Sequence, residues 1–195
     1  LWLNLKRVRL FGHTADSLKM NAINGPQQGS VVDVQVNGFA GVSGWINGQI
    51  GDPSDGKAPI RLSFDLSGED MGATLAAFGR PSATTRWLRG FGHGEISGSY
   101  SGTSTAGEMT LQAQSRRLVF DLAGRLRPSF GAWDGDIARL DGRFDDFDFD
   151  AEGGRFAYAA GGSLRLEDVT GRLSGSRLDL HSLQLRPQAG VWQGA

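Results

Sequence analysis

Alternation of apolar and polar residues is the feature that most constrains this chain. In the run from 60 to 67 every second residue is apolar, and these members are Ile60, Leu62, Phe64 and Leu66. The same period recurs in six further runs, with apolar members Val32, Val34 and Val36; Leu118, Phe120, Leu122 and Leu126; Phe147 and Phe149; Leu164 and Leu166; Leu178 and Leu180; and Leu183 and Leu185. Because residues i and i+2 of a strand lie on one face, the pattern predicts sheets that are apolar on one side and wet on the other.

Glycine-containing dipeptides separate these runs. The chain has 30 glycines among 195 residues, about twice the usual share of ~7%. The dipeptides that can supply the positive φ of a tight turn are Asn24-Gly25, Asn37-Gly38, Asn47-Gly48, Asp55-Gly56, Asp134-Gly135, Asp141-Gly142, Gly153-Gly154 and Gly161-Gly162. Their spacing predicts an antiparallel meander of about a dozen strands. At ~4.8 Å a strand, such a sheet would extend roughly 55–60 Å and would tend to curl.

One segment has helical rather than strand spacing. Met71, Leu75 and Phe78 recur at i, i+4 and i+7, and Gly79 and Pro81 follow as a stop signal. We therefore expect one short α-helix at about residues 70–79, inside a helical insertion at about 69–89, with its apolar stripe against the sheet.

Composition excludes several classes of protein. Lys and Arg number 20 against 21 Asp and Glu, for a formal net charge of −1, so we expect no nucleic-acid partner. The chain has no cysteine, which removes disulfide scaffolds, thiolate metal sites and cysteine nucleophiles. The chain contains no run of 18 apolar residues, so its sequence predicts no membrane-spanning helix. Because residue 1 is Leu and already belongs to a strand-like run, we expect 1–195 to be one β-rich segment of a longer repetitive protein.

The acidic run near residue 150 is the strongest candidate for a metal site. Its members are Asp145, Asp146, Asp148, Asp150 and Glu152. Calcium loops place carboxylates at alternate positions, but here Phe147 and Phe149 fill the positions between them. A strand with a wet acidic face explains both sets of residues, so we predict no metal site and no cofactor.

No catalytic motif withstands inspection. The three histidines, His13, His93 and His181, form no metal-ligand spacing. The stretch Gly90–Gly94 lacks the spacing of a phosphate loop, and Gly98–Gly102 has tyrosine where a nucleophile elbow needs serine. We predict that the chain is not an enzyme. Paired carboxylates for glycoside hydrolysis stay open as an alternative, because that geometry is spatial.

The segment 62–81 resembles part of the AsmA-like proteins. In that family a strand leads into a short helix of the form D-x-G-x-x-L-x-x-x-G-x-P, which Asp70, Gly72, Leu75, Gly79 and Pro81 match. Gly90–Gly94 stands where the family often has a double glycine. Runs such as Gly171–Leu180 are similar to the repetitive strands of the family.

The resemblance implies a function and a location. AsmA-like proteins, which include TamB-like and YhdP-like members, resemble bridge-like lipid carriers with a curled, taco-shaped sheet and an apolar groove that shields acyl chains. By that resemblance the full-length protein would lie in the Gram-negative periplasm, anchored in the inner membrane by a segment outside this chain. Its partners would be lipid acyl chains, the membrane and other envelope proteins. The family supplies no catalytic motif.

The groove-facing residues are predicted from the alternation itself. They are Val34, Val36, Leu62, Phe64, Phe120 and Leu122, whose polar neighbours must face the other way. A filled sandwich core has the same alternation. Two other functions therefore stay open: a structural or interaction β-domain of an envelope protein or adhesin, and a carbohydrate-binding or hydrolytic β-domain.

Overall fold

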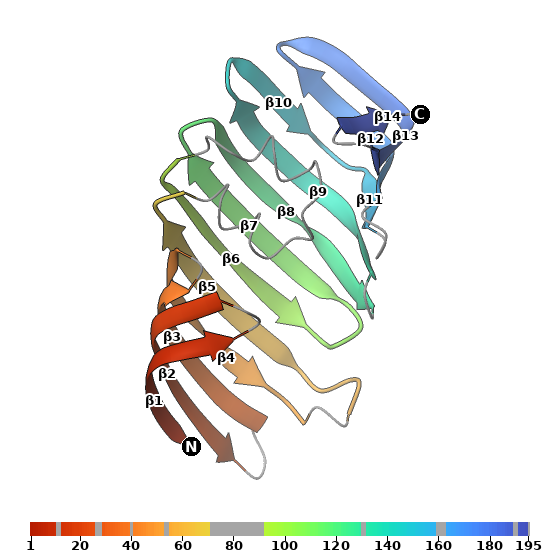
Figure 1. Ribbon diagram of the computed structural model, residues 1–195. Helices are drawn as coiled ribbons and strands as arrows, with labels where there is room; N and C mark the ends of the chain where they lie inside the picture. The colour runs from red at the N-terminus through yellow and green to blue at the C-terminus, as the bar shows by residue number, and fades with distance from the viewer. Residues whose placement is uncertain are drawn as a thin grey trace.

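The computed structural model describes residues 1–10, 13–25, 29–39, 41–52, 55–70, 92–129, 132–158, 163–188 and 191–194. These residues form fourteen strands of one sheet (Figure 1). The strands are β1 (Trp2–Leu10), β2 (His13–Gly25), β3 (Gly29–Phe39), β4 (Val42–Ile50), β5 (Ile60–Gly68), β6 (Gly94–Gly102), β7 (Gly107–Ser115), β8 (Leu118–Ser129), β9 (Ala132–Phe144), β10 (Phe147–Ala151), β11 (Arg155–Tyr158), β12 (Leu164–Leu173), β13 (Ser176–Gln188) and β14 (Val191–Gly194).

Each strand pairs antiparallel with its neighbours in sequence, which confirms the predicted mainly-β meander. The one departure is that β10 and β11 share a place in the sheet. β10 pairs with residues 140–144 of β9, β11 pairs with residues 133–136, and both pair with β12 on the other side.

The predicted helix is not seen. The described residues contain no helix, and Asp70, where the helix was expected to begin, lies in a turn after β5. Residues 71–79, and with them Met71, Leu75 and Phe78, lie outside the described residues.

Several predicted turns are wrong. Asn47-Gly48 lies inside β4, and both Asp134-Gly135 and Asp141-Gly142 lie inside β9. Asp55-Gly56 does lie in the loop from β4 to β5, where the Lys57 amide donates to Asp55 Oδ1 at 2.9 Å. Gly153 and Gly154, with φ of +96° and +133°, separate β10 from β11.

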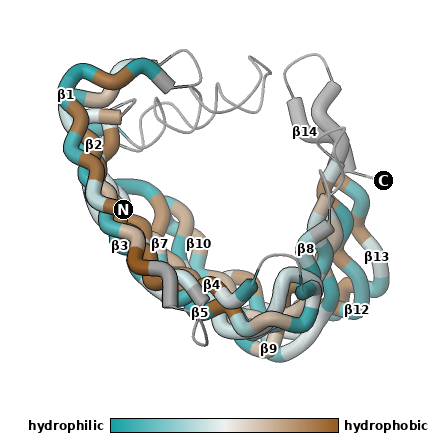
Figure 2. The backbone as a smooth tube through the Cα atoms, turned by 90° about the horizontal axis from the view of Figure 1, so that it is seen from below, coloured by the Kyte–Doolittle hydropathy of each residue, from teal (hydrophilic) through white to brown (hydrophobic). Residues whose placement is uncertain are grey.

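The sheet is strongly curved. Seen from below, the overlapping strands outline an open C, with β1 on one arm and β13 on the other (Figure 2). The two faces of the sheet therefore differ in shape as well as in composition. We call the apolar face, which carries the even-numbered residues of β3, β4, β5 and β8, the inner face, and the opposite one the outer face.

Burial places the apolar face on the concave side. Among the described strands, the buried apolar side chains all belong to this face: Ala15, Val42, Ile137, Ala151, Phe156 and Val169. Every described strand belongs to the same sheet, so no second layer of described elements covers them. The ring of Phe156 is 8% exposed, because it lies over Gly135 of the adjacent strand and packs with the other apolar side chains of this face.

A line of irregularities crosses the sheet from β9 to β13, and we call it the crease. Ala138 is an extra residue of β9, since Ala123 pairs with Arg139 but Gly124 pairs with Ile137. The break at residues 152–154 lies beside it, between β10 and β11. Asp168 and His181 then fall outside the β12–β13 ladder, and Asp168 has a φ of +52°. Such bulges bend a sheet and increase its local twist.

The crease also explains a change of phase in the sequence. An extra residue moves the following side chains to the opposite face. Leu180 and Leu183 are three residues apart, yet with His181 outside the ladder both lie on the inner face. The same holds for Ile137 and Leu140 in β9.

Candidate functional site: the inner face

The six predicted groove residues lie on the inner face. Val36 and Phe120 belong to one transverse row of paired residues, Val34, Phe64 and Leu122 belong to the next row, and Leu62 belongs to the third. All six side chains are half-buried. The alternation therefore brings together on one surface residues that are up to 88 positions apart in sequence (34 to 122).

The register makes each row continuous. The first row runs Leu5, Leu18, Val36, Gly44, Leu66, Ile96, Ala113, Phe120, Gly142, Phe149 and Leu173. The second row runs Leu3, Met20, Val34, Ile46, Phe64, Gly98, Leu111, Leu122, Leu140, Ala151, Gly171 and Leu178. Neither row contains a polar side chain. At ~4.8 Å a strand, the first row spans about 50 Å from β1 to β12.

Glycines on the inner face make room for rings of the adjacent strand. A Cβ placed on Gly98 would lie 2.8 Å from Cζ of Phe64, and one on Gly142 would lie 2.6 Å from Cζ of Phe149. Gly135 stands in the same relation to Phe156, at 2.6 Å, and Gly107 to Tyr100. Asp134-Gly135 and Asp141-Gly142 have the composition of turns, but both glycines lie inside β9. The sequence signal for this position is that both glycines occupy the apolar phase of their strand.

One part of the inner face is closed by its own side chains. Ile137, Ala151, Phe156 and Val169 form a buried cluster next to the crease. The half-buried side chains that pack against this cluster are Leu122, Leu126, Leu140, Leu166 and Leu180. Of the six predicted groove residues, only Leu122 touches this cluster.

Aromatic rings extend this closed part toward the ends of the strands. Trp133 stacks on Tyr158, with ring centroids 5.1 Å apart, and meets the edge of Phe156 at 5.7 Å. The indole is still 42% exposed. Phe147, an apolar member of the predicted alternation, is 58% exposed at the start of β10, so its place on the inner face does not bury it.

The outer face is charged and its charges are matched across strands. Arg127 on β8 bonds Asp134 Oδ1 and Asp136 Oδ2 on β9, each at 2.6 Å. Arg155 on β11 bonds Asp168 at 2.9 Å and Glu167 at 3.2 Å. The hydrogen bonds from Arg127 lower the pKa of Asp136, and the nearby positive charges of Arg127, Arg125 and Arg155 add to the effect. These ion pairs are compatible with an outer face that is exposed to water. They also stabilise the register of β8, β9 and β11.

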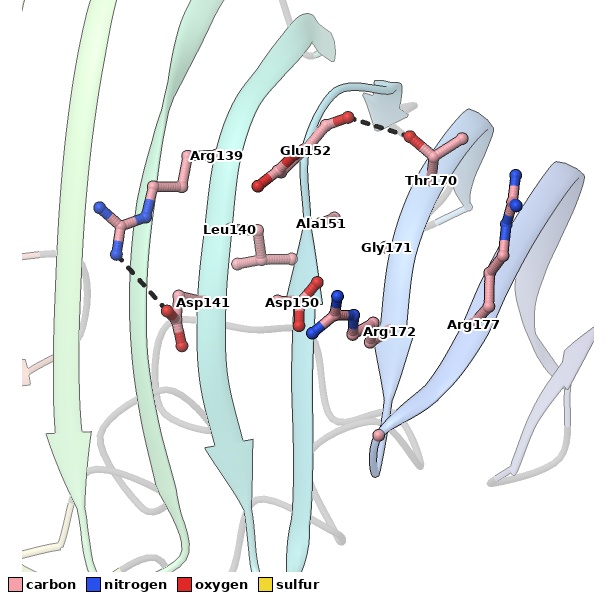
Figure 3. Close-up of a pocket in the computed structure, with 11 residues that line it drawn as sticks. Arg139, Leu140, Asp141, Asp150, Ala151, Glu152, Thr170, Gly171, Arg172 and Arg177 are labelled. Carbon is pink, nitrogen blue, oxygen red and sulfur yellow. Dashed lines mark hydrogen bonds and ion pairs between the residues drawn. The ribbon is translucent and has the colours of Figure 1, made fainter.

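The acidic run lies on this outer face and at a hairpin. Arg117 forms a two-pronged ion pair with Asp145, with the Nε–Oδ1 distance at 2.8 Å, and this hydrogen bond lowers the pKa of Asp145. A depression of about 840 Å³ is lined by side chains of both signs, among them Arg139, Asp141, Asp150, Arg172 and Arg177 (Figure 3). Within the described ranges, no three His, Asp or Glu side chains converge as metal ligands would.

Neither described histidine with an ion-pair contact lies in an enclosed site. His93 precedes β6, with Nε2 3.8 Å from Glu95, and His181 stands at the crease, with Nδ1 3.3 Å from Asp168. Both imidazoles are mostly exposed. This geometry places them on the surface of the sheet rather than beside a nucleophile.

Comparison of the chain with family models, with curated proteins and with solved structures found no match to any of them. In the part of the chain that the structure describes, no helix has the length and apolar character needed to cross a membrane.

Proposed function

We propose that this chain is a lipid-shielding segment of an AsmA-like, bridge-like transport protein, and that its inner face is an open groove for acyl chains. The observation that carries the proposal is the pair of unbroken apolar rows on the concave side of the sheet, which no other described strand covers. Burying one such side chain is worth about 1.5–3 kcal/mol. A face with more than a dozen of them needs a partner that is equally apolar.

The location and partners follow from the same proposal. The full-length protein would lie in the periplasm, with an inner-membrane anchor outside these residues, and would convey phospholipid across the envelope without catalysis. The charged outer face supports this proposal, since its matched Arg and Asp residues suit water.

Phe64→Asp tests the groove against a packed core. Phe64 lies in the second row and is half-buried. In an open groove the new carboxylate is hydrated when lipid is absent, so the circular dichroism spectrum should persist while lipid co-purified with the full-length protein falls severalfold. In a packed core a lone carboxylate costs several kcal/mol and should unfold the domain.

Ser63→Asp is the matched control, because Ser63 is the neighbour of Phe64 and points to the outer face. It adds the same charge and should change neither the spectrum nor the co-purified lipid. Unfolding of the Phe64→Asp variant, or absence of lipid from the unaltered protein, would favour a structural or interaction domain instead.

A further inference from the structure

The inner face is not equally accessible along its length. In β3–β6 its central side chains Val34, Phe64 and Ile96 are half-buried, and Ile46 is 37% exposed. We call this part the open section. In β9–β12 four inner-face side chains form the buried cluster, with Ile137 at 7% and Phe156 at 8% exposure. Ile137 lies in the third row, in which Leu62 of β5 is half-buried. We call that part the closed section.

The crease accounts for this difference. The extra residue Ala138, the break at 152–154 and the positive φ of Asp168 all lie across the closed section. Each bulge increases bending, so side chains from the four strands β9, β10, β11 and β12 converge in one cluster. In the open section the β4–β5 and β5–β6 ladders run in uninterrupted register, and the β3–β4 ladder is irregular near its end, between Val36 and Phe39.

The chemistry of the open section selects its occupant. Residues 30–36 of β3, residues 44–50 of β4 and all of β5 and β6 pair with a strand on each side. Their backbone amides and carbonyls are used in these ladders, so this part of the inner face offers a peptide or a sugar no backbone hydrogen-bonding partner. The side chains above it in the first two rows are aliphatic, apart from Phe64. An unbranched alkyl chain has no hydrogen-bonding groups, so it gives up no hydrogen bond to water when it binds there.

We infer that an acyl chain occupies the open section over β3–β6 and is held off the closed section at β9–β12, where Ile137, Ala151, Phe156 and Val169 form a constriction. This inference rests on the proposed function and adds to it a boundary within the groove. Leu122, which packs against the buried cluster, lies at that boundary.

Two phenylalanines provide a matched test. Phe64 and Phe156 each cover an inner-face glycine of the adjacent strand, Gly98 and Gly135, but they lie in different sections. Each is replaced in turn by p-azidophenylalanine in the full-length protein, and Trp45 on the outer face serves as the background position. The proteins are irradiated with vesicles of phosphatidylethanolamine and phosphatidylglycerol, and lipid adducts are quantified by mass spectrometry.

The inference predicts about tenfold more adduct at position 64 than at 156, with position 156 close to the background at 45. Equal yields at 64 and 156, both well above 45, would overturn the constriction and leave the groove intact. A yield at 64 no greater than at 45 would overturn the proposed function itself.

A second measurement avoids any effect of substitution on folding. The unaltered full-length protein is irradiated with the same vesicles containing phosphatidylethanolamine with a diazirine in its acyl chain, and modified peptides are mapped. Labels should concentrate in 30–37 and 60–68 and be at least fivefold rarer in 132–140 and 155–158. An even distribution over both sections would overturn the constriction.

Discussion

At single positions, the inner face is built from pairs in which one strand supplies a ring and its neighbour a glycine. Phe149 lies over Gly142, and Phe156 over Gly135. The ring covers backbone that a glycine leaves bare, and the glycine lets the ring lie close to the sheet. The outer face uses charge instead, as in the contacts of Arg127 with Asp134 and Asp136.

Gly142→Ala should destabilise the protein by about 1–3 kcal/mol, the usual cost of overpacking. Its new methyl group would lie 2.6 Å from Cζ of Phe149 and 2.6 Å from the Val119 carbonyl oxygen. Gly56→Ala is the control, because the nearest atom to its methyl group is Ser104 Oγ at 3.9 Å. Urea denaturation measures both variants. Equal stability of the two would show that the ring at Phe149 moves aside freely.

Acid should weaken the link between β8 and β9. Arg127 lowers the pKa of Asp136 in the folded protein. The stabilisation is therefore complete above the ordinary carboxyl pKa of about 4 and is lost as the pH falls through the lowered value. Because both side chains are partly exposed, it amounts to about 1 kcal/mol or less. Thermal denaturation between pH 7 and 2.5 should show a shallower acid slope for Asp136→Asn than for the unaltered protein; identical slopes would contradict the prediction.

At the scale of the strand, single extra residues decide which side chains face inward. Ala138 divides β9 into two parts of opposite phase, so that Leu140 and Ile137 share the inner face. Asp134 and Asp136 remain outside, within reach of Arg127. The bulge thus lets β9 place Ile137 and Leu140 on the inner face while its aspartates stay on the charged outer face.

Deletion of Ala138 should straighten β9 without moving its side chains to the other face. Without the extra residue, Arg139 follows Ile137 directly and Ile137 still pairs with Gly124, so Ile137 stays inside and Asp136 stays outside. The bend at the bulge is lost, so we expect looser packing of Ile137 in the buried cluster, a lower melting temperature and a weaker near-ultraviolet signal of Trp133. The control inserts one glycine between Ser104 and Thr105, in the exposed turn before β7. A deletion variant that melts near the unaltered protein would show that the cluster packs equally well without the bend.

At the scale of the whole molecule, the strands that the structure describes contact their immediate neighbours in the sheet and few other described strands. Such a quasi-one-dimensional arrangement transmits a local change only to adjoining elements. The closed section differs from the rest of the described sheet, because side chains from β9, β10, β11 and β12 pack together there in one buried cluster. The sheet should therefore have regions of different stability rather than one uniform stability.

Ile137→Ala should reveal this non-uniformity. Removing a buried Ile side chain costs about 2–5 kcal/mol, and the loss should be confined to the strands that share its cluster. Hydrogen exchange should accelerate in β8–β12 and change little in β3–β5. Uniform acceleration across all strands would mean that the sheet opens as a single cooperative unit.

The sequence by itself determined the strands and their faces. Alternation has a period of two and the pleat has a period of two, so Val34, Phe64 and Phe120 had to lie on one side of their strands wherever those strands lay in the sheet. Short spacing between runs likewise determined the meander, because neighbouring strands with short connections pair antiparallel.

Only the tertiary structure decided the rest. Asp134-Gly135 and Asp141-Gly142 have the composition of turns, yet they lie inside β9, because Phe156 and Phe149 of the adjacent strands occupy the space above those glycines. The crease and the closed section also depend on which residues of distant strands stand opposite each other. The face on which a side chain lies depends on the backbone of its own strand, so the local sequence pattern predicts it. Curvature and burial depend on many contacts between strands, which the local pattern does not contain.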